Sequence, residues 1–271
     1  QKTECNIAFA KFIDNNYENW VNSDLDKPLF SNKLISERLI KDISTSEKTL
    51  FIVIDNLRYD QWKTIEPHIL KYYNKSNEEA YFSILPTATQ YARNSLFSGL
   101  MPLEIQKKFP QYWKFDHEEG GKNLYERELL LENLKTLGLS NLKTEYIKIT
   151  NLKKGKKLEE DFNSKLENDL IVLVYNFVDM LSHSKTEMEM IKELASDDKS
   201  YRSLTASWFI NSPLMGIIKQ ASELNIKLVI TTDHGTINVK NPTRVIGNKD
   251  LSSNLRYKTG RSLSYNDKEV I

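Results

Sequence analysis

Three short runs of apolar, largely β-branched residues constrain the fold of this 271-residue chain more than any other feature of its sequence. They are Leu50–Ile54, Leu170–Tyr175 and Leu228–Ile230. Continuous apolar runs of this length are typical of strands buried on both faces of a parallel sheet, because a half-exposed strand would alternate apolar and polar residues. Two weaker strand candidates are Ala80–Leu85 and Glu145–Ile149.

Helical segments separate the predicted strands. Their approximate bounds are Asp60–Tyr73, Thr89–Leu100, Leu124–Leu137, Lys185–Ala195 and Leu204–Leu224, the last of which Pro213 is expected to break. Strands and helices alternate along the chain. This order predicts an α/β fold with a mainly parallel central sheet flanked by helices.

Residues 1–47 contain no strand pattern and are predicted to form helices. Apolar residues at three- and four-residue spacings from Ile7 to Val21 indicate one helix, and Ser31 can cap a second helix that runs to Ile43. This part can be a docking segment or the first layer of the main domain. We therefore divide the chain into a helical connector or appendage at 1–47 and a main domain at 48–271, which we expect to be truncated at its C-terminus.

The composition excludes several classes of function. The charges nearly cancel to +1, so no global field steers the chain onto nucleic acid or a membrane. Cys5 is the single cysteine, which excludes an internal disulfide framework and a thiolate-rich metal site. The chain has four histidines, so a metal site must consist mostly of carboxylates. The longest apolar runs are too short to span a bilayer, and we expect a cytoplasmic protein without membrane insertion.

A carboxylate follows each of the three strongest predicted strands, and a histidine accompanies it after two of them. Asp55 follows the first run, the pair Asp179 and His183 follows the second, and the pair Asp233 and His234 follows the third. Ligands of open α/β sheets bind at the carboxyl ends of the strands, so these side chains are expected to share one edge. A single aspartate after a strand is usually a turn former, but several such clusters at one edge would repel one another without a cation. Carboxylate and imidazole ligands without thiolates suit Zn²⁺ or Mn²⁺.

A fourth segment at this edge, Pro86-Thr87-Ala88-Thr89, offers a nucleophile. Thr89 begins a predicted helix, so its hydroxyl would lie near unpaired N–H groups at the positive helix end. A threonine hydroxyl is a poor nucleophile near neutral pH, but a metal ion can activate it. The simpler alternative is that Thr89 only caps the helix. Arg93, one helical turn later, could contact a substrate phosphate or pair with a nearby acid.

The order of these motifs resembles the alkaline phosphatase superfamily, and within it the nucleotide pyrophosphatase/phosphodiesterase arrangement. Several segments are similar, more closely, to the PglZ domain that forms the output module of PorX-type response regulators of type IX secretion. They are residues 51–62 (FIVIDNLRYDQW), 85–94 (LPTATQYARN) and 254–258 (NLRYK). The resemblance covers about residues 5–265.

The resemblance implies a role for each candidate residue. Asp55, Asp233 and His234 would bind one zinc ion, Thr89 would be the nucleophile bridging toward it, and Asp179 and His183 would bind a second zinc ion. In the superfamily the second ion also takes a later histidine, but no histidine follows His234 in this chain. We therefore expect either a chain that ends before that ligand or an incomplete second site.

Two functions of different classes follow from this resemblance. The first is a zinc-dependent phosphodiesterase that acts on nucleotides, or on cyclic or linear oligonucleotides, as the effector domain of a response regulator. The second is a catalytically silent scaffold that binds a secretion or transcription partner. A phosphomonoesterase or mutase stays open within the superfamily, whereas a sulfatase would need Cys or Ser at Thr89. The implied partners are the phosphodiester substrate, a receiver domain in the same full-length protein and a second copy in a homodimer.

Overall fold

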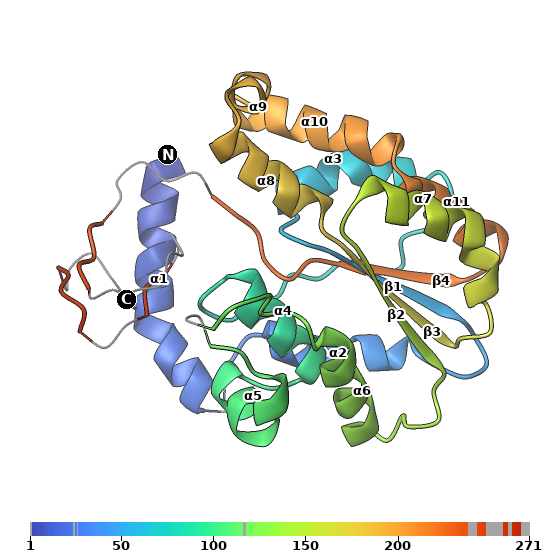
Figure 1. Ribbon diagram of the computed structural model, residues 1–271, viewed down its shortest axis with the longest axis horizontal. Coiled ribbons are helices and arrows are strands. Elements are labelled where there is room, and N and C mark those ends of the chain that lie inside the picture. The colour runs from blue at the N-terminus through green and yellow to red at the C-terminus, as the bar shows by residue number, and fades with distance from the viewer. Residues whose placement is uncertain are drawn as a thin grey trace.

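A four-stranded, fully parallel sheet forms the centre of the molecule (Figure 1). The structure is a computed structural model that describes residues 2–23, 25, 27–115, 118–237, 243–247, 257–259 and 262–266. The strands are β1 (Thr49–Ile54), β2 (Thr144–Ile149), β3 (Leu170–Tyr175) and β4 (Lys227–Thr231), in the spatial order β2-β3-β1-β4. The predicted α/β class is confirmed, and each of the three strongest apolar runs forms a strand.

Strands β1 and β3 are buried on both faces, as their continuous apolar sequences predict. In β1, Ile52 packs into one core together with its register partner Leu173, whereas Phe51 packs into the other core together with Val172. The outer strands β2 and β4 are mostly half-buried, because each has only one neighbouring strand. The sheet therefore separates two hydrophobic cores.

Helices cover both faces of the sheet (Figure 1). The helices on one side are α3 (Tyr59–Ile69), α7 (Leu152–Asp161), α8 (Phe177–Glu187), α9 (Glu189–Leu194), α10 (Asp198–Ile210) and α11 (Pro213–Glu223). Those on the other side are α2 (Leu34–Glu37), α4 (Thr89–Ser98), α5 (Pro102–Lys108) and α6 (Glu126–Thr136). Short 3-10 turns lie at Ser31–Lys33, Leu39–Lys41, Pro110–Tyr112 and Phe162–Lys165.

The helical predictions hold with shifted boundaries. The break expected at Pro213 separates α10 from α11. The helix expected at Lys185–Ala195 begins earlier, at Phe177, and is interrupted at Met188, where the backbone is extended. Helix α4 ends at Gly99, whose φ of 74° is a left-handed conformation that glycine adopts without strain.

Two expectations near the N-terminus are wrong. Ala80–Leu85 does not form a strand. The backbone of Phe82 bonds to the backbone of residues 29–31 and not to a strand of the sheet, so it makes only an isolated bridge with Phe30. The second N-terminal helix, expected from Ser31 to Ile43, breaks into α2 and two 3-10 turns. Four of its apolar residues are nevertheless buried in the core that α4 and α6 share, namely Leu34, Ile35, Leu39 and Ile43.

Helix α1 (Lys2–Asn22) lies beside this sandwich and buries none of its residues fully (Figure 1). It contacts the main body through aromatic rings, with Phe9 stacked on Phe82 at a centroid distance of 6.2 Å. The Tyr17 hydroxyl accepts a hydrogen bond from the backbone N–H of Leu85 at 2.8 Å. The domain boundary at residue 47 stays a prediction. No helix in the described part of the chain has both the length and the apolar character needed to cross a membrane.

Candidate functional site

The sheet order explains why the candidate residues converge. Strand β1 lies between β3 and β4, so the segments that follow these three parallel strands emerge side by side. Asp55 directly follows β1 and continues its ladder, because its N–H donates to the carbonyl of Tyr175 at 2.9 Å. Asp233 and His234 follow β4, and Asp179 lies in the first turn of α8 after β3.

Asp55, Asp233 and His234 form a buried cluster that could hold a metal ion. One ligand atom from each residue lies within 4.8 Å of the other two. His234 Nε2 is 3.7 Å from Asp55 Oδ1 and also 3.7 Å from Asp233 Oδ2. All three side chains are buried, so the ligand atoms are largely removed from competing water. This is the grouping expected from the residues that follow β1 and β4.

The electrostatics of Asp233 fit a cation at this cluster. Asp233 Oδ1 accepts hydrogen bonds from the backbone N–H groups of Asn56 (3.1 Å) and His234 (2.9 Å). Asp233 Oδ2 is buried without a hydrogen-bond partner. Burial and the negative charge of Asp55 raise the pKa of Asp233 well above its ordinary value. A divalent cation would satisfy the free oxygen and relieve the repulsion, and this donor set suits Zn²⁺ or Mn²⁺.

Thr89 lies against this cluster at the beginning of α4. Its Oγ1 is 3.0 Å from His234 Nε2 and 3.4 Å from Asp55 Oδ1. Asn123 donates from Nδ2 to the carbonyl oxygen of Thr89 at 3.2 Å and thereby braces the first residue of the helix. Thr89 is half-buried, whereas its neighbours in the cluster are fully buried. This is the position that a nucleophile beside a metal ion would take.

Asp179 and His183 lie together but outside this cluster. His183 Nε2 is 3.5 Å from Asp179 Oδ2, and the His183 side chain is 68% exposed. Asp179 Oδ1 accepts a hydrogen bond from Asn56 Nδ2 at 3.2 Å. Within the described ranges, the three-residue metal cluster contains neither of them. Their role as ligands of a second ion stays a prediction.

Arg93 pairs with an acid of the site, which is one of the two roles its position suggested. Arg93 is 1% exposed, and its Nη1 donates to Asp55 Oδ2 at 2.6 Å. The carboxylate of Glu126 on α6 binds Nε of the same guanidinium. Although burial disfavours the charged form, Glu126, Asp55 and Asp233 together raise the pKa of Arg93 above its ordinary value. The four-residue spacing from Thr89 was a signal for Arg93, whereas no sequence pattern indicated Glu126.

Asn56 is a second residue that the sequence did not single out. It lies between the two groups of candidate ligands, with its backbone bonded to Asp233 and its side chain bonded to Asp179. Its φ of 62° places it in the left-handed region, which asparagine tolerates better than most residues with a side chain.

The conformation of Asn56 leads to a prediction about stability. Asn56→Gly and Asn56→Ala both remove the amide that binds Asp179, but only alanine is strained at this φ. We expect the alanine variant to unfold with a free energy about 1 kcal/mol lower than that of the glycine variant. Urea unfolding of both variants in the presence of a chelator measures this difference. Equal stabilities would show that the left-handed conformation is not maintained in solution.

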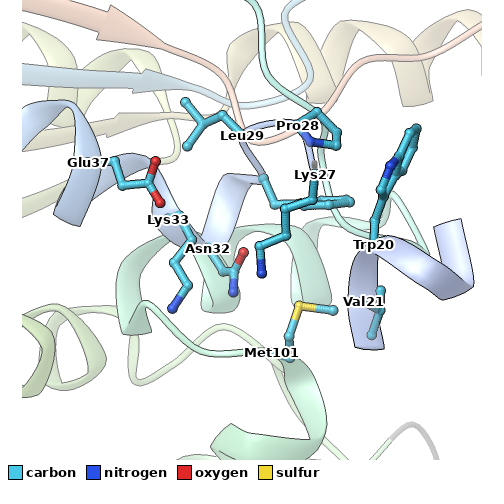
Figure 2. A pocket seen from close by; sticks show the side chains of 10 residues that line it. Trp20, Val21, Lys27, Pro28, Leu29, Asn32, Lys33, Glu37 and Met101 are labelled. Carbon is cyan, nitrogen blue, oxygen red and sulfur yellow. The ribbon is translucent and has the colours of Figure 1, made fainter. Parts of the chain in front are cut away.

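The hollow shown in Figure 2 is separate from this cluster. It has a volume of about 280 Å³ and lies beside the end of α1, with Trp20 and Val21 on one side and Met101 on another. Lys27 and Lys33 also line it. None of the six candidate site residues contributes to its wall. The candidate residues therefore lie at the carboxyl edge of the sheet, away from this hollow.

Comparison with known families agrees with the geometry of this edge. A family model described as the BREX system PglZ alkaline phosphatase-like domain matches residues 35–271. The match includes all six candidate residues, together with Asn56, Arg93 and Glu126. No curated protein matches the chain significantly.

Proposed function

Because the chain belongs to the PglZ family of alkaline phosphatase-like domains, we propose that it is a metal-dependent phosphodiesterase with Thr89 as its nucleophile. The observation that carries this proposal is the Thr89 hydroxyl at 3.0 Å from His234 and 3.4 Å from Asp55 in a buried ligand cluster. A threonine that only capped its helix would not require two buried groups of a possible metal site beside its hydroxyl. The family membership itself indicates phosphoester chemistry.

The residues of the site would have different roles in the proposed reaction. Asp55, Asp233 and His234 would hold the ion, which when bound would polarise a phosphoryl oxygen and favour an ionised hydroxyl. Thr89 Oγ1 would form a bond to phosphorus and lose its proton to water, while the ester P–O bond breaks and the leaving alcohol takes up a proton from water. The positive end of α4 would stabilise the added negative charge, because Thr89 is its first residue. The other ester group of the substrate would stay on the phosphorus bound to Thr89, and water would then cleave the bond from Thr89 to phosphorus, which releases a phosphomonoester and restores the hydroxyl.

Nucleotide phosphodiesters are the substrate class that we propose. The net charge of +1 suits small nucleotides, or short cyclic and linear oligonucleotides, better than long duplexes. We propose zinc as the metal, with manganese as the alternative, and a second ion at Asp179 and His183.

A role as the output domain of a PorX-type response regulator is part of the same proposal. Helix α1 supports it, because Tyr17 binds the backbone of Leu85 just four residues before Thr89. Residues 1–47 would then act as a connector from a receiver domain to the site, in a homodimer that regulates type IX secretion.

Metal removal tests the proposed function. We expect chelation to lower the hydrolysis of bis-p-nitrophenyl phosphate and of cyclic and linear dinucleotides at least about 100-fold, because the ion supplies several kcal/mol of transition-state stabilisation. Added Zn²⁺ or Mn²⁺ should restore the rate. p-Nitrophenyl phosphate is the comparison substrate, and faster turnover of this monoester would favour a phosphomonoesterase.

A scaffold without turnover is the second candidate. The exposure of His183 favours it, since a highly exposed imidazole competes with water for the ion and makes a weak second site. Full metal content together with no hydrolysis of any diester or monoester in the panel would support the scaffold and contradict the phosphodiesterase.

A further inference from the structure

We propose that Arg93 is a positioning residue that orients Asp55 as a metal ligand, an inference that rests on the metal centre of the proposed function. Arg93 would act through the carboxylate that it holds and not by contact with substrate. Arg93 is 1% exposed, and its guanidinium is already bound to Asp55 and Glu126.

The two oxygens of Asp55 have different partners. Oδ2 accepts from Arg93 Nη1 at 2.6 Å, whereas Oδ1 points to the cluster, 3.4 Å from Thr89 Oγ1 and 3.7 Å from His234 Nε2. A carboxylate held at one oxygen cannot rotate freely, so the other oxygen is fixed toward the ion. Without Arg93, either oxygen of Asp55 could turn toward the ion.

A chain of charged and polar groups holds Arg93 itself in place. Glu126 binds Arg93 Nε, and its other oxygen accepts from Lys148 Nζ at 2.8 Å and from the Tyr146 hydroxyl. Glu126 is 1% exposed. The attraction within a buried ion pair often fails to offset the free energy lost when both charges are removed from water. Stabilisation of the fold alone is therefore a weak explanation for this series of buried charged groups. Orientation of a ligand is a use that the geometry supports directly.

One turn of α4 carries both functional groups. Thr89 and Arg93 are four residues apart and therefore lie on the same face of the helix. Arg93 thus ties the helix that presents the hydroxyl to the strand end that presents Asp55. Lysine could neutralise Asp55, but it lacks the planar fork that binds Asp55 and Glu126 at once.

Cobalt binding tests this inference without any measurement of activity. Wild type, Arg93→Lys, Arg93→Met and Glu126→Gln would be titrated with Co²⁺ while the visible d–d spectrum and the dissociation constant are recorded. Both Arg93 variants should bind Co²⁺ about 10- to 100-fold more weakly and show an altered spectrum, because the ligand oxygen is no longer fixed. Glu126→Gln should also weaken Co²⁺ binding and alter the d–d spectrum, but to a smaller extent.

Leu130→Ala is the control for stability. Leu130 is buried on α6 in the same core as α4 and contributes no group to the cluster, so this variant should lose stability and keep the wild-type Co²⁺ spectrum. If Arg93→Met does not fold, Arg93→Lys and Glu126→Gln decide the question.

Three outcomes separate this inference from the function on which it rests. Weakened binding and a changed spectrum in the folded variants, but not in Leu130→Ala, support the positioning role. Wild-type affinity and spectrum in Arg93→Lys and Glu126→Gln contradict it, even if their melting temperatures fall. Absence of Co²⁺ binding by the wild-type chain would instead contradict the metal centre and with it the proposed function.

Discussion

Thr89→Val should lower phosphodiester turnover by roughly 1,000-fold or more while metal content stays at the wild-type value. Valine has nearly the same shape as threonine but no hydroxyl, so the attacking oxygen is lost and the packing is kept. The three groups that could bind the ion, on Asp55, Asp233 and His234, remain in place. Steady-state rates on a nucleotide diester, together with elemental analysis of the purified variant, measure both quantities.

Thr89→Ser is the matched control for this substitution. Serine keeps a hydroxyl at the first position of α4 and can still lie near His234 Nε2 and Asp55 Oδ1. We expect it to retain far more turnover than the valine variant. Undiminished activity in Thr89→Val would contradict a threonine nucleophile, and loss of metal in Thr89→Val would mean that the rate does not report on the nucleophile alone.

The sheet could be predicted because its strands have a strong local signal. Continuous apolar runs are typical of buried strands, and β1 and β3 are indeed buried between the two cores. The run in β4 also forms a strand, but this strand is half-buried because it lies at the edge of the sheet. Ala80–Leu85 misled the same reasoning, because a short β-prone segment does not reveal its pairing partner. Its partner is the backbone near Phe30, which is about fifty residues away in the sequence and outside the sheet.

The site was predictable in part for a similar reason. The segments after parallel strands share one edge, and the strand order brings Asp55, Asp233 and His234 together there. No comparable sequence pattern indicated which residues contact these three side chains. The partner of Arg93 on α6, Glu126, depends on how two helices pack, and the left-handed turn at Asn56 depends on two distant carboxylates.

Asp233→Asn should abolish metal-dependent stabilisation and, at the same time, make the metal-free protein more stable. In the described part of the chain, the lysine and arginine side chains that pair with the buried carboxylates of Asp55, Glu126 and Asp233 are Arg93 and Lys148. Asp233 is the least compensated of the three, because its Oδ2 has no hydrogen-bond partner and its nearest Arg93 nitrogen is 3.9 Å away. Asparagine removes this charge and retains an oxygen for the N–H groups of Asn56 and His234.

The two expected effects have opposite signs, which makes the measurement decisive. In chelator, the free energy of unfolding of Asp233→Asn should exceed that of wild type by about 1 kcal/mol, because a poorly compensated buried charge is gone. At a Zn²⁺ or Mn²⁺ concentration that saturates the wild type, the free energy of unfolding should rise for the wild type only, since the variant lacks one anionic ligand. Asp42→Asn, which removes a half-exposed carboxylate paired with Lys227, is the control and should keep the metal response. A variant that is less stable without metal and still stabilised by it would show that Asp233 is a structural acid and not a ligand.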